Sequence, residues 1–189
     1  MKNYLIILAL TIILLIACKQ KKESKEKEDK PISVLSIIKG QLNHLDTSLY
    51  QLTKYETIDN RTDTSDLQRN EIKKFAAPFL SLPEIADQKY YEKYSEERLL
   101  DAQQQTLNIT STLKDSVDAE IQKQIVIIDI ADISSGKVQS IYIDRYIASG
   151  DSVIQQKLFW ELDKYFSIGS ITEKENQPDK THYIKIAWE

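Results

Sequence analysis

Few side chains in this sequence could perform chemistry, and they are scattered along it. The 189 residues include one cysteine, Cys18, and two histidines, His44 and His182, against 29 aspartates and glutamates. A cysteine thiolate is a strong nucleophile. Two histidines without a second cysteine do not build the usual zinc site unless carboxylates complete it. With so many acids some pair always looks suitable for glycoside cleavage, so no particular pair is singled out.

Motifs of common enzyme classes are absent from the sequence. It holds no G-x-S-x-G, no H-E-x-x-H and no Walker loop, and it has only four glycines. The acidic stretch 59–63 is not an EF-hand loop, because Arg61 stands where the third position needs an acid. His44 falls near the end of a predicted helix and His182 in a predicted strand, where surface and packing roles are expected. The sequence therefore predicts a protein that is not an enzyme, with no catalytic residue, metal site or cofactor.

Cys18 stands directly after an apolar segment. Lys2 supplies a positive charge, and residues 4–16 are apolar except for Thr11. That run has the length of a signal peptide and is too short for the roughly 20 apolar residues of a spanning helix. It ends in Leu15, Ile16 and small Ala17, followed by Cys18. This pattern resembles the lipobox of bacterial lipoproteins, which signal peptidase II processes.

The resemblance implies three modifications. A diacylglycerol thioether forms on the Cys18 sulfur, the chain is cleaved before Cys18, and the new amino group is acylated with a fatty acid such as palmitate. Residues 1–17 would then be a signal peptide, and a lipidated Cys18 leaves no partner for a disulfide. An ordinary signal peptide or a short membrane anchor with an incidental cysteine is the alternative reading.

The residues after Cys18 predict a solvated tether. Residues 19–30 contain no apolar side chain and mix lysines with acids. Among lipoproteins of enteric bacteria an Asp after the cysteine favours the inner membrane, so Lys19 favours the outer membrane by resemblance. In Bacteroidota, acids near the cysteine can direct export to the surface, and Glu23, Glu26, Glu28 and Asp29 match that signal loosely. The membrane face is left open.

Residues 31–189 are expected to form one globular domain. Ile32, Leu35, Ile38, Leu42 and Leu45 recur at helical spacing and predict an amphipathic helix over 31–45. Residues 48–59 predict a strand, 66–80 a helix that Pro78 bends or ends, and 83–87 one further helical turn. The tyrosines of 89–94 are expected to pack along a sheet edge with their hydroxyls in water; stacking on sugar rings or a partner is the alternative.

From residue 96 onward the hydrophobic pattern has a period of two. It predicts strands at 96–101, 105–113, 120–130, 137–147, 152–161, 165–174 and 181–188. Because the connections are short and rich in turn residues, neighbouring strands must be antiparallel. The predicted class is therefore α+β: an antiparallel β-meander of about seven or eight strands, packed on one face by two or three N-terminal helices.

The expected function is a non-enzymatic binding or interaction module of the cell envelope, held at the membrane by its lipid anchor. The net charge of −4 argues against a nucleic-acid partner. An envelope protein, peptidoglycan or a lipid could be bound, and the oligomeric state is left open. A helix-covered curved sheet is similar in shape to lipoprotein carriers, and the whole layout resembles uncharacterised lipoproteins of Bacteroidota, which supplies no activity. A structural or immunity-type lipoprotein and a carboxylate-dependent hydrolase are the remaining alternatives.

Overall fold

The computed structural model describes residues 31–131 and 136–189. The predicted signal peptide (1–17) and the predicted segment 18–30, which comprises Cys18 and the tether, lie outside the described residues.

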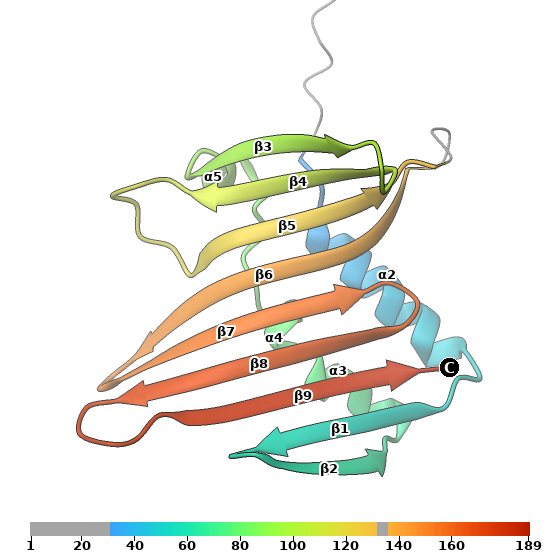
Figure 1. Ribbon diagram of the computed structural model, residues 1–189, viewed down its shortest axis with the longest axis vertical. Helices are drawn as coiled ribbons and strands as arrows, with labels where there is room; N and C mark the ends of the chain where they lie inside the picture. Colours follow the sequence, from blue (N-terminus) through green and yellow to red (C-terminus); the bar gives the residue numbers. More distant parts are fainter. Residues whose placement is uncertain (1–30, 132–135) are drawn as a thin grey trace, which may run out of the picture. The chain divides into compact units, whose positions relative to one another are not determined.

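Nine strands form one antiparallel sheet, in the order β2-β1-β9-β8-β7-β6-β5-β4-β3 (Figure 1). The strands are β1 (Leu52–Ile58), β2 (Arg61–Asp66), β3 (Tyr94–Asp101), β4 (Thr106–Leu113), β5 (Ile121–Asp129), β6 (Lys137–Ser149), β7 (Ser152–Glu161), β8 (Tyr165–Lys174) and β9 (Lys180–Trp188). Strands β3 to β9 confirm the predicted meander. The sheet is open, with β2 and β3 at its edges.

The hairpin of β1 and β2 extends the sheet beyond the meander. β1 pairs with β9 from Leu52 opposite Trp188 to Ile58 opposite His182, so an early strand lies beside the last one. Asp59 and Asn60 connect β1 to β2 with φ angles of 44° and 71°, as the two central residues of a type I′ turn require. β2 was missed in the sequence because RTDTSD shows no apolar alternation; its pairing with β1 through backbone hydrogen bonds makes it a polar edge strand.

One helix is long. α2 (Val34–Thr47) begins after Ser33, whose hydroxyl accepts a hydrogen bond from the backbone N–H of Ser36 at 3.3 Å. Its buried residues are Val34, Ile38, Leu42 and Leu45. The predicted helix over 31–45 is confirmed in type and in most of its apolar stripe.

The prediction of one helix over 66–80 was wrong. Residue 66 still belongs to β2, and the rest divides into a 3-10 turn η1 (Arg69–Glu71), α3 (Ile72–Phe75) and α4 (Ala77–Leu80). Pro78 lies in the first turn of α4, where its missing N–H costs nothing, so it begins a helix there instead of ending one. The further helical turn predicted at 83–87 was also wrong in position: those residues are not helical, and the short helix α5 (Gln88–Tyr91) follows them.

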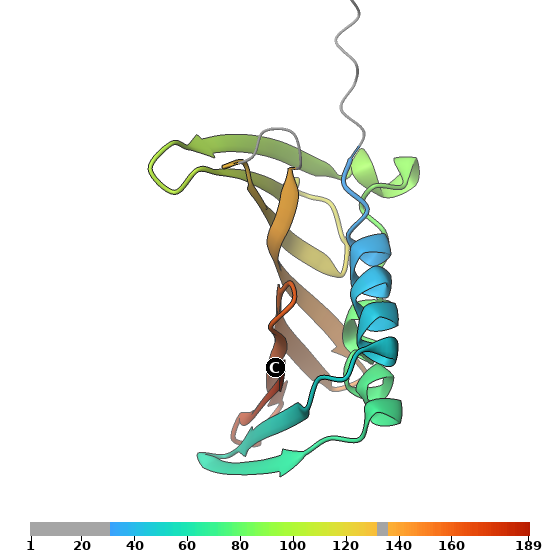
Figure 2. The ribbon, with the colours of Figure 1, turned by 90° about the vertical axis from the view of Figure 1, so that its right-hand side faces the viewer.

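The class is accordingly mostly β. Among the described residues α2 is the only helix longer than four residues. The predicted balance of α+β and the count of seven or eight strands are therefore corrected to an open sheet of nine strands with few and short helices. Figure 2 shows these helices along one face of the sheet, and both sheet edges bending away from them.

The core lies between the helices and the sheet. Phe79 of α4 makes edge contacts with Trp160 of β7 and Phe166 of β8, at centroid distances of 5.1 and 5.6 Å. Trp160 stacks on Phe166 at 4.8 Å. All three side chains are fully buried. Such rings bury large apolar areas, so this cluster and the apolar stripe of α2 are the main apolar attachment of the helices to the sheet.

Tyr94 corrects one expectation. It is the first residue of β3 and is buried, and its hydroxyl donates a hydrogen bond to the carbonyl of Ile121 at 2.9 Å. Burial, and secondly the charge of Glu120, raise the pKa of Tyr94 to about 12. This hydroxyl is thus a protonated structural donor and not a water-facing group, whereas Tyr91 in α5 is exposed.

Candidate functional site

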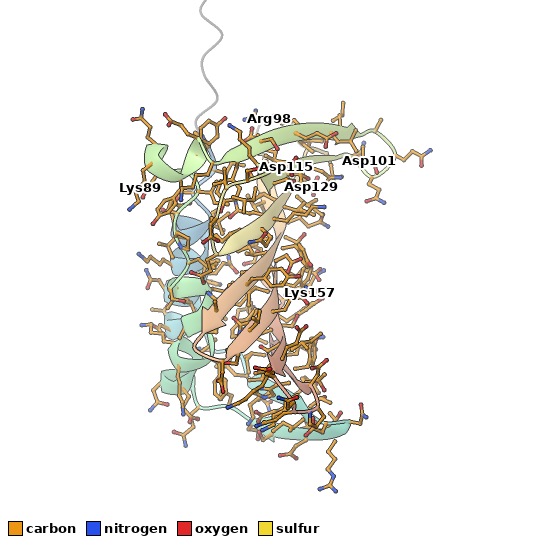
Figure 3. All side chains as sticks on the ribbon, turned by 90° about the vertical axis from the view of Figure 1, so that its left-hand side faces the viewer. Lys89, Arg98, Asp101, Asp115, Asp129 and Lys157 are labelled. Atoms are coloured by element: carbon orange, nitrogen blue, oxygen red, sulfur yellow. The ribbon has the colours of Figure 1, made fainter. Side chains whose placement is uncertain are left out.

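The side of the sheet opposite the helices is the candidate binding surface, and we call it the uncovered face. Side chains alternate along a strand, so the buried Leu158 and Trp160 place Lys157 and Phe159 on the uncovered face. Figure 3 shows Lys157 on the side of the sheet away from α2. The same alternation assigns a set of aromatic and basic side chains to this face: Tyr142 and Phe159, Tyr165, Tyr183 and Lys185.

Small residues open a depression along β8 on this face. Gly169 stands between Lys157 of β7 and Tyr183 of β9, and Ser167 stands between Phe159 and Lys185. Each neighbour of β8 therefore contributes one lysine and one aromatic residue. Lys157 faces Tyr183 across Gly169, and Phe159 faces Lys185 across Ser167. A hollow of about 230 Å³ lies over Gly169, and its lining includes Gln155, Lys157, Ile171, Thr181, His182 and Tyr183.

Gly169 leaves space above the strand, and its backbone conformation does not require a glycine. A Cβ added there would meet the Cδ2 atom of Tyr183 at 3.8 Å and the carbonyl oxygen of Lys157 at 4.0 Å, both ordinary contacts. The fold thus tolerates a side chain at this position, but a side chain would occupy the hollow. A glycine inside a strand often marks a place where another group comes close to the backbone.

The charges near the hollow are distributed unevenly. Lys157 is exposed and, within the part of the chain that the structure describes, it has no ion pair or side-chain hydrogen bond. Asp144 lies opposite Lys157 on the far side from the hollow, and its Oδ1 atom is buried without a hydrogen-bond partner in the described structure. The ammonium of Lys185 lies 4.0 Å from the centroid of the Tyr165 ring. This cation–π contact keeps a second positive charge on the same face.

Two tyrosines of the uncovered face have a raised pKa. Burial, and secondly the charge of Asp144, raise the pKa of Tyr142. Burial, and secondly the charge of Glu161, raise the pKa of Tyr165. Like ordinary tyrosines, both hydroxyls are protonated at neutral pH and can donate as well as accept hydrogen bonds, and the raised pKa extends this to more alkaline pH.

A second polar cluster lies on the other side of the sheet, at the margin of β1 and β9. The Oε2 atom of Glu56 forms an ion pair with the ammonium of Lys54 at 2.7 Å, and its Oε1 atom lies 2.8 Å from Nε2 of His182. The hydrogen bond from Lys54, followed by that from His182, lowers the pKa of Glu56. A carboxylate held ionised in this way is a structural anion and is not tuned to donate a proton.

Of the residues singled out in the sequence, His44 and His182 lie in the described part of the chain, and each makes contacts of its own. Leu15, Ile16, Ala17 and Cys18 lie outside the described residues. His44 in the last turn of α2 makes an edge contact with Tyr50, and the described residues contain no group of three or more His, Cys, Asp or Glu that could hold a metal. The hollow was missed. Its one sequence signal is the glycine inside an otherwise regular strand over 165–174.

The sequence of any one strand does not predict which residues border the hollow. Gly169, Lys157 and Tyr183 come from three strands, and only the pairing register of the meander brings them together.

Comparison with known proteins finds no matching family model, no matching curated protein and no matching solved structure. None of the helices in the described residues is both long enough and apolar enough to cross a membrane.

Proposed function

We propose that this chain is a lipid-anchored protein of the bacterial cell envelope that binds a partner through the uncovered face of its sheet and does not catalyse a reaction. The hollow over Gly169, with Lys157 and Tyr183 on its two sides, is the observation that carries the proposal. The helix side of the sheet is occupied by the protein's own core. The uncovered face is thus the large sheet surface on which another molecule can lie.

The anchor is proposed from the sequence pattern around Cys18. Lipidation there, followed by the charged segment 19–30, would leave residues 31–189 beside the membrane, with the outer membrane favoured by Lys19. Two or more acyl chains hold a protein stably, at about 0.8 kcal/mol per buried CH₂. A domain held near a surface meets its partner at a high local concentration, which suits a binding protein with a shallow site.

Two alternatives receive less support. A lipid carrier needs an apolar chamber, whereas Phe79, Trp160 and Phe166 occupy the space between α4 and the sheet. A carboxylate-dependent hydrolase needs an acid with a raised pKa beside an ionised one. Glu56 and Asp163 are instead both acids whose pKa is lowered, by separate cationic partners.

Photo-crosslinking in the producing cells tests the proposal. A benzophenone amino acid at Ile171, which lines the hollow and is 36% exposed, should form a discrete adduct with one envelope component. The same group at Tyr91, which is 40% exposed on α5, is the control and should form none. Benzophenone inserts into C–H bonds of proteins and sugars alike. Equal adducts from both positions, or none from either, would contradict binding by the uncovered face.

A further inference from the structure

We infer that the hollow over Gly169 binds a short acidic saccharide, with a sugar ring against Tyr183 and a carboxylate at Lys157. This inference rests on the proposed function, because it names the ligand of the uncovered face. Shape, hydrogen-bonding groups and charge support it separately.

The shape suits a small polar ligand. The hollow has a volume of about 230 Å³ and is open to solvent, below the roughly 300 to 1,000 Å³ of pockets that enclose drug-sized molecules. One ring can therefore enter while the rest of a chain extends along the sheet. The absence of a side chain at Gly169 allows a ring to approach the backbone between Lys157 and Tyr183.

The available hydrogen-bonding groups are those that recognise hydroxyl groups. Backbone N–H and C=O groups of β8 are used by β7 and β9 on its two sides, so a ligand must be recognised by side chains. In the described structure, no hydrogen bond occupies the side chains of Gln155 or Thr181. An amide and a hydroxyl each both donate and accept, as sugar hydroxyls do. Tyr183 is 42% exposed and offers an aromatic surface to the apolar side of a ring.

The charge selects an acidic ligand. The protein carries a net charge of −4, yet among the side chains that line the hollow in the described residues Lys157 is the only lysine, and none is an arginine, aspartate or glutamate. Asp144 of β6 lies opposite Lys157 on the side away from the hollow, but no ion pair joins the two in the described structure, so a carboxylate in the hollow can bind Lys157 without breaking an existing pair. A charge-assisted hydrogen bond of this kind is about twice as strong as a neutral one.

An acidic peptide is the competing ligand, and the position of the hollow argues against it. An extended peptide gains most of its affinity by pairing its backbone with an unpaired edge strand. The hollow lies over β8, which the strands β9 and β1 separate from the edge strand β2, so it offers no free backbone groups.

The test measures binding by titration calorimetry with the full chain purified from membranes in detergent. The probes are tetragalacturonate, the same tetrasaccharide after reduction of its carboxylates, and hexaglutamate. Three variants are compared with the unaltered chain. Lys157→Gln removes the charge, Gly169→Leu fills the hollow, and Lys39→Gln, at an exposed position of α2, is the charge-matched control.

We expect tetragalacturonate to bind, and to bind more weakly as salt concentration rises. Lys157→Gln should weaken binding about tenfold, the value of one hydrogen bond to a charged group. Gly169→Leu should abolish binding although the chain remains folded by circular dichroism, and Lys39→Gln should change nothing. The reduced tetrasaccharide should bind about tenfold more weakly than the acidic one.

Four results would overturn the inference. Equal binding of the acidic and reduced tetrasaccharides would show that Lys157 does not recognise the carboxylate. Binding of hexaglutamate as tight as that of tetragalacturonate would show that the hollow does not select a saccharide. Failure of every probe, with adducts still formed from Ile171 in cells, would reject the acidic saccharide and leave the proposed function standing. Failure of both experiments would reject the two together.

Discussion

The guanidinium of Arg145 in β6 donates a hydrogen bond to the carbonyl oxygen of Pro78 in α4 at 3.1 Å. The Arg145 side chain is 6% exposed and also pairs with Glu120 at 2.9 Å and with the amide oxygen of Gln156 at 2.8 Å. One buried cation thus joins a four-residue helix to two strands of the sheet. A helix this short does not hold itself in place, so its position depends on such tertiary contacts.

Replacing Arg145 should therefore loosen α4. Arg145→Met keeps most of the apolar stem but leaves the Pro78 carbonyl and Glu120 without their donor, and we expect a loss of about 2 kcal/mol in the free energy of unfolding. Urea unfolding of the full chain measures it. Lys137→Met is the control, because its ion pair with Asp163 is exposed by 68% and 40% and should contribute at most about 0.5 kcal/mol. Equal effects of the two variants would contradict the stabilisation of α4 by Arg145.

The aromatic cluster under α4 should be the most sensitive part of the core. Phe79→Ala removes a fully buried ring from its contacts with Trp160 and Phe166, and we expect it to destabilise the protein by about 4 kcal/mol. Phe159 lies beside Trp160 on the same strand but on the uncovered face and is half-buried. Phe159→Ala should cost about half as much. Thermal unfolding compares the two variants. An equal loss of stability would contradict a core that lies between the helices and the sheet.

Asp163 should make stability depend on pH. It accepts hydrogen bonds from Lys137 at 2.7 Å and from Gln41 at 3.0 Å, and these contacts lower its pKa from the usual 3.8. A carboxyl with a lowered pKa in the folded state contributes stability above its unfolded pKa, and this contribution is lost as pH falls through the folded pKa. The contribution is therefore complete above about pH 5 and is lost progressively as pH falls below the unfolded pKa of about 3.9 towards the lower folded pKa.

Asp163→Asn is the matching variant. The φ angle of residue 163 is 62°, a conformation that Asn adopts as readily as Asp, so the substitution changes charge without straining the backbone. At neutral pH the variant should be less stable than the unaltered chain by at most about 1 kcal/mol, because the site is partly exposed. The difference should shrink as pH falls towards 3. Urea midpoints measured from pH 7 to 2.5 check this, and a difference independent of pH would contradict it.

Cys18→Ala should release the protein from the membrane fraction. Without the thiol no thioether can form, and the resemblance to lipoproteins implies that cleavage before residue 18 then fails as well. Fractionation and intact mass of the chain measure both effects. Ser24→Ala in the predicted tether is the control and should remain membrane-bound and cleaved. Retention of the Cys18→Ala chain in an amount equal to the control would mean that another feature holds the protein at the membrane.

Local patterns in the sequence were sufficient for most of the sheet. Alternation of apolar and polar residues over 165–174 predicted the bounds of β8, and the helical spacing of Ile38, Leu42 and Leu45 predicted α2. Both patterns record which face of an element is buried, and that information is local. The short connections from residue 101 onward also determine an antiparallel meander, since neighbouring strands have no length in which to cross over.

Long-range pairing decided the rest. Residues 61–66 are too polar to predict a strand, and β2 exists because β1 offers it a backbone ladder. Similarly, β1 lies beside β9 although more than 100 residues separate Ile58 from His182, and no local pattern encodes that choice. The candidate hollow has the same origin. Gly169, Lys157 and Tyr183 are ordinary residues in three separate strands, and they become one site because cross-strand register, a property of the folded sheet, aligns them.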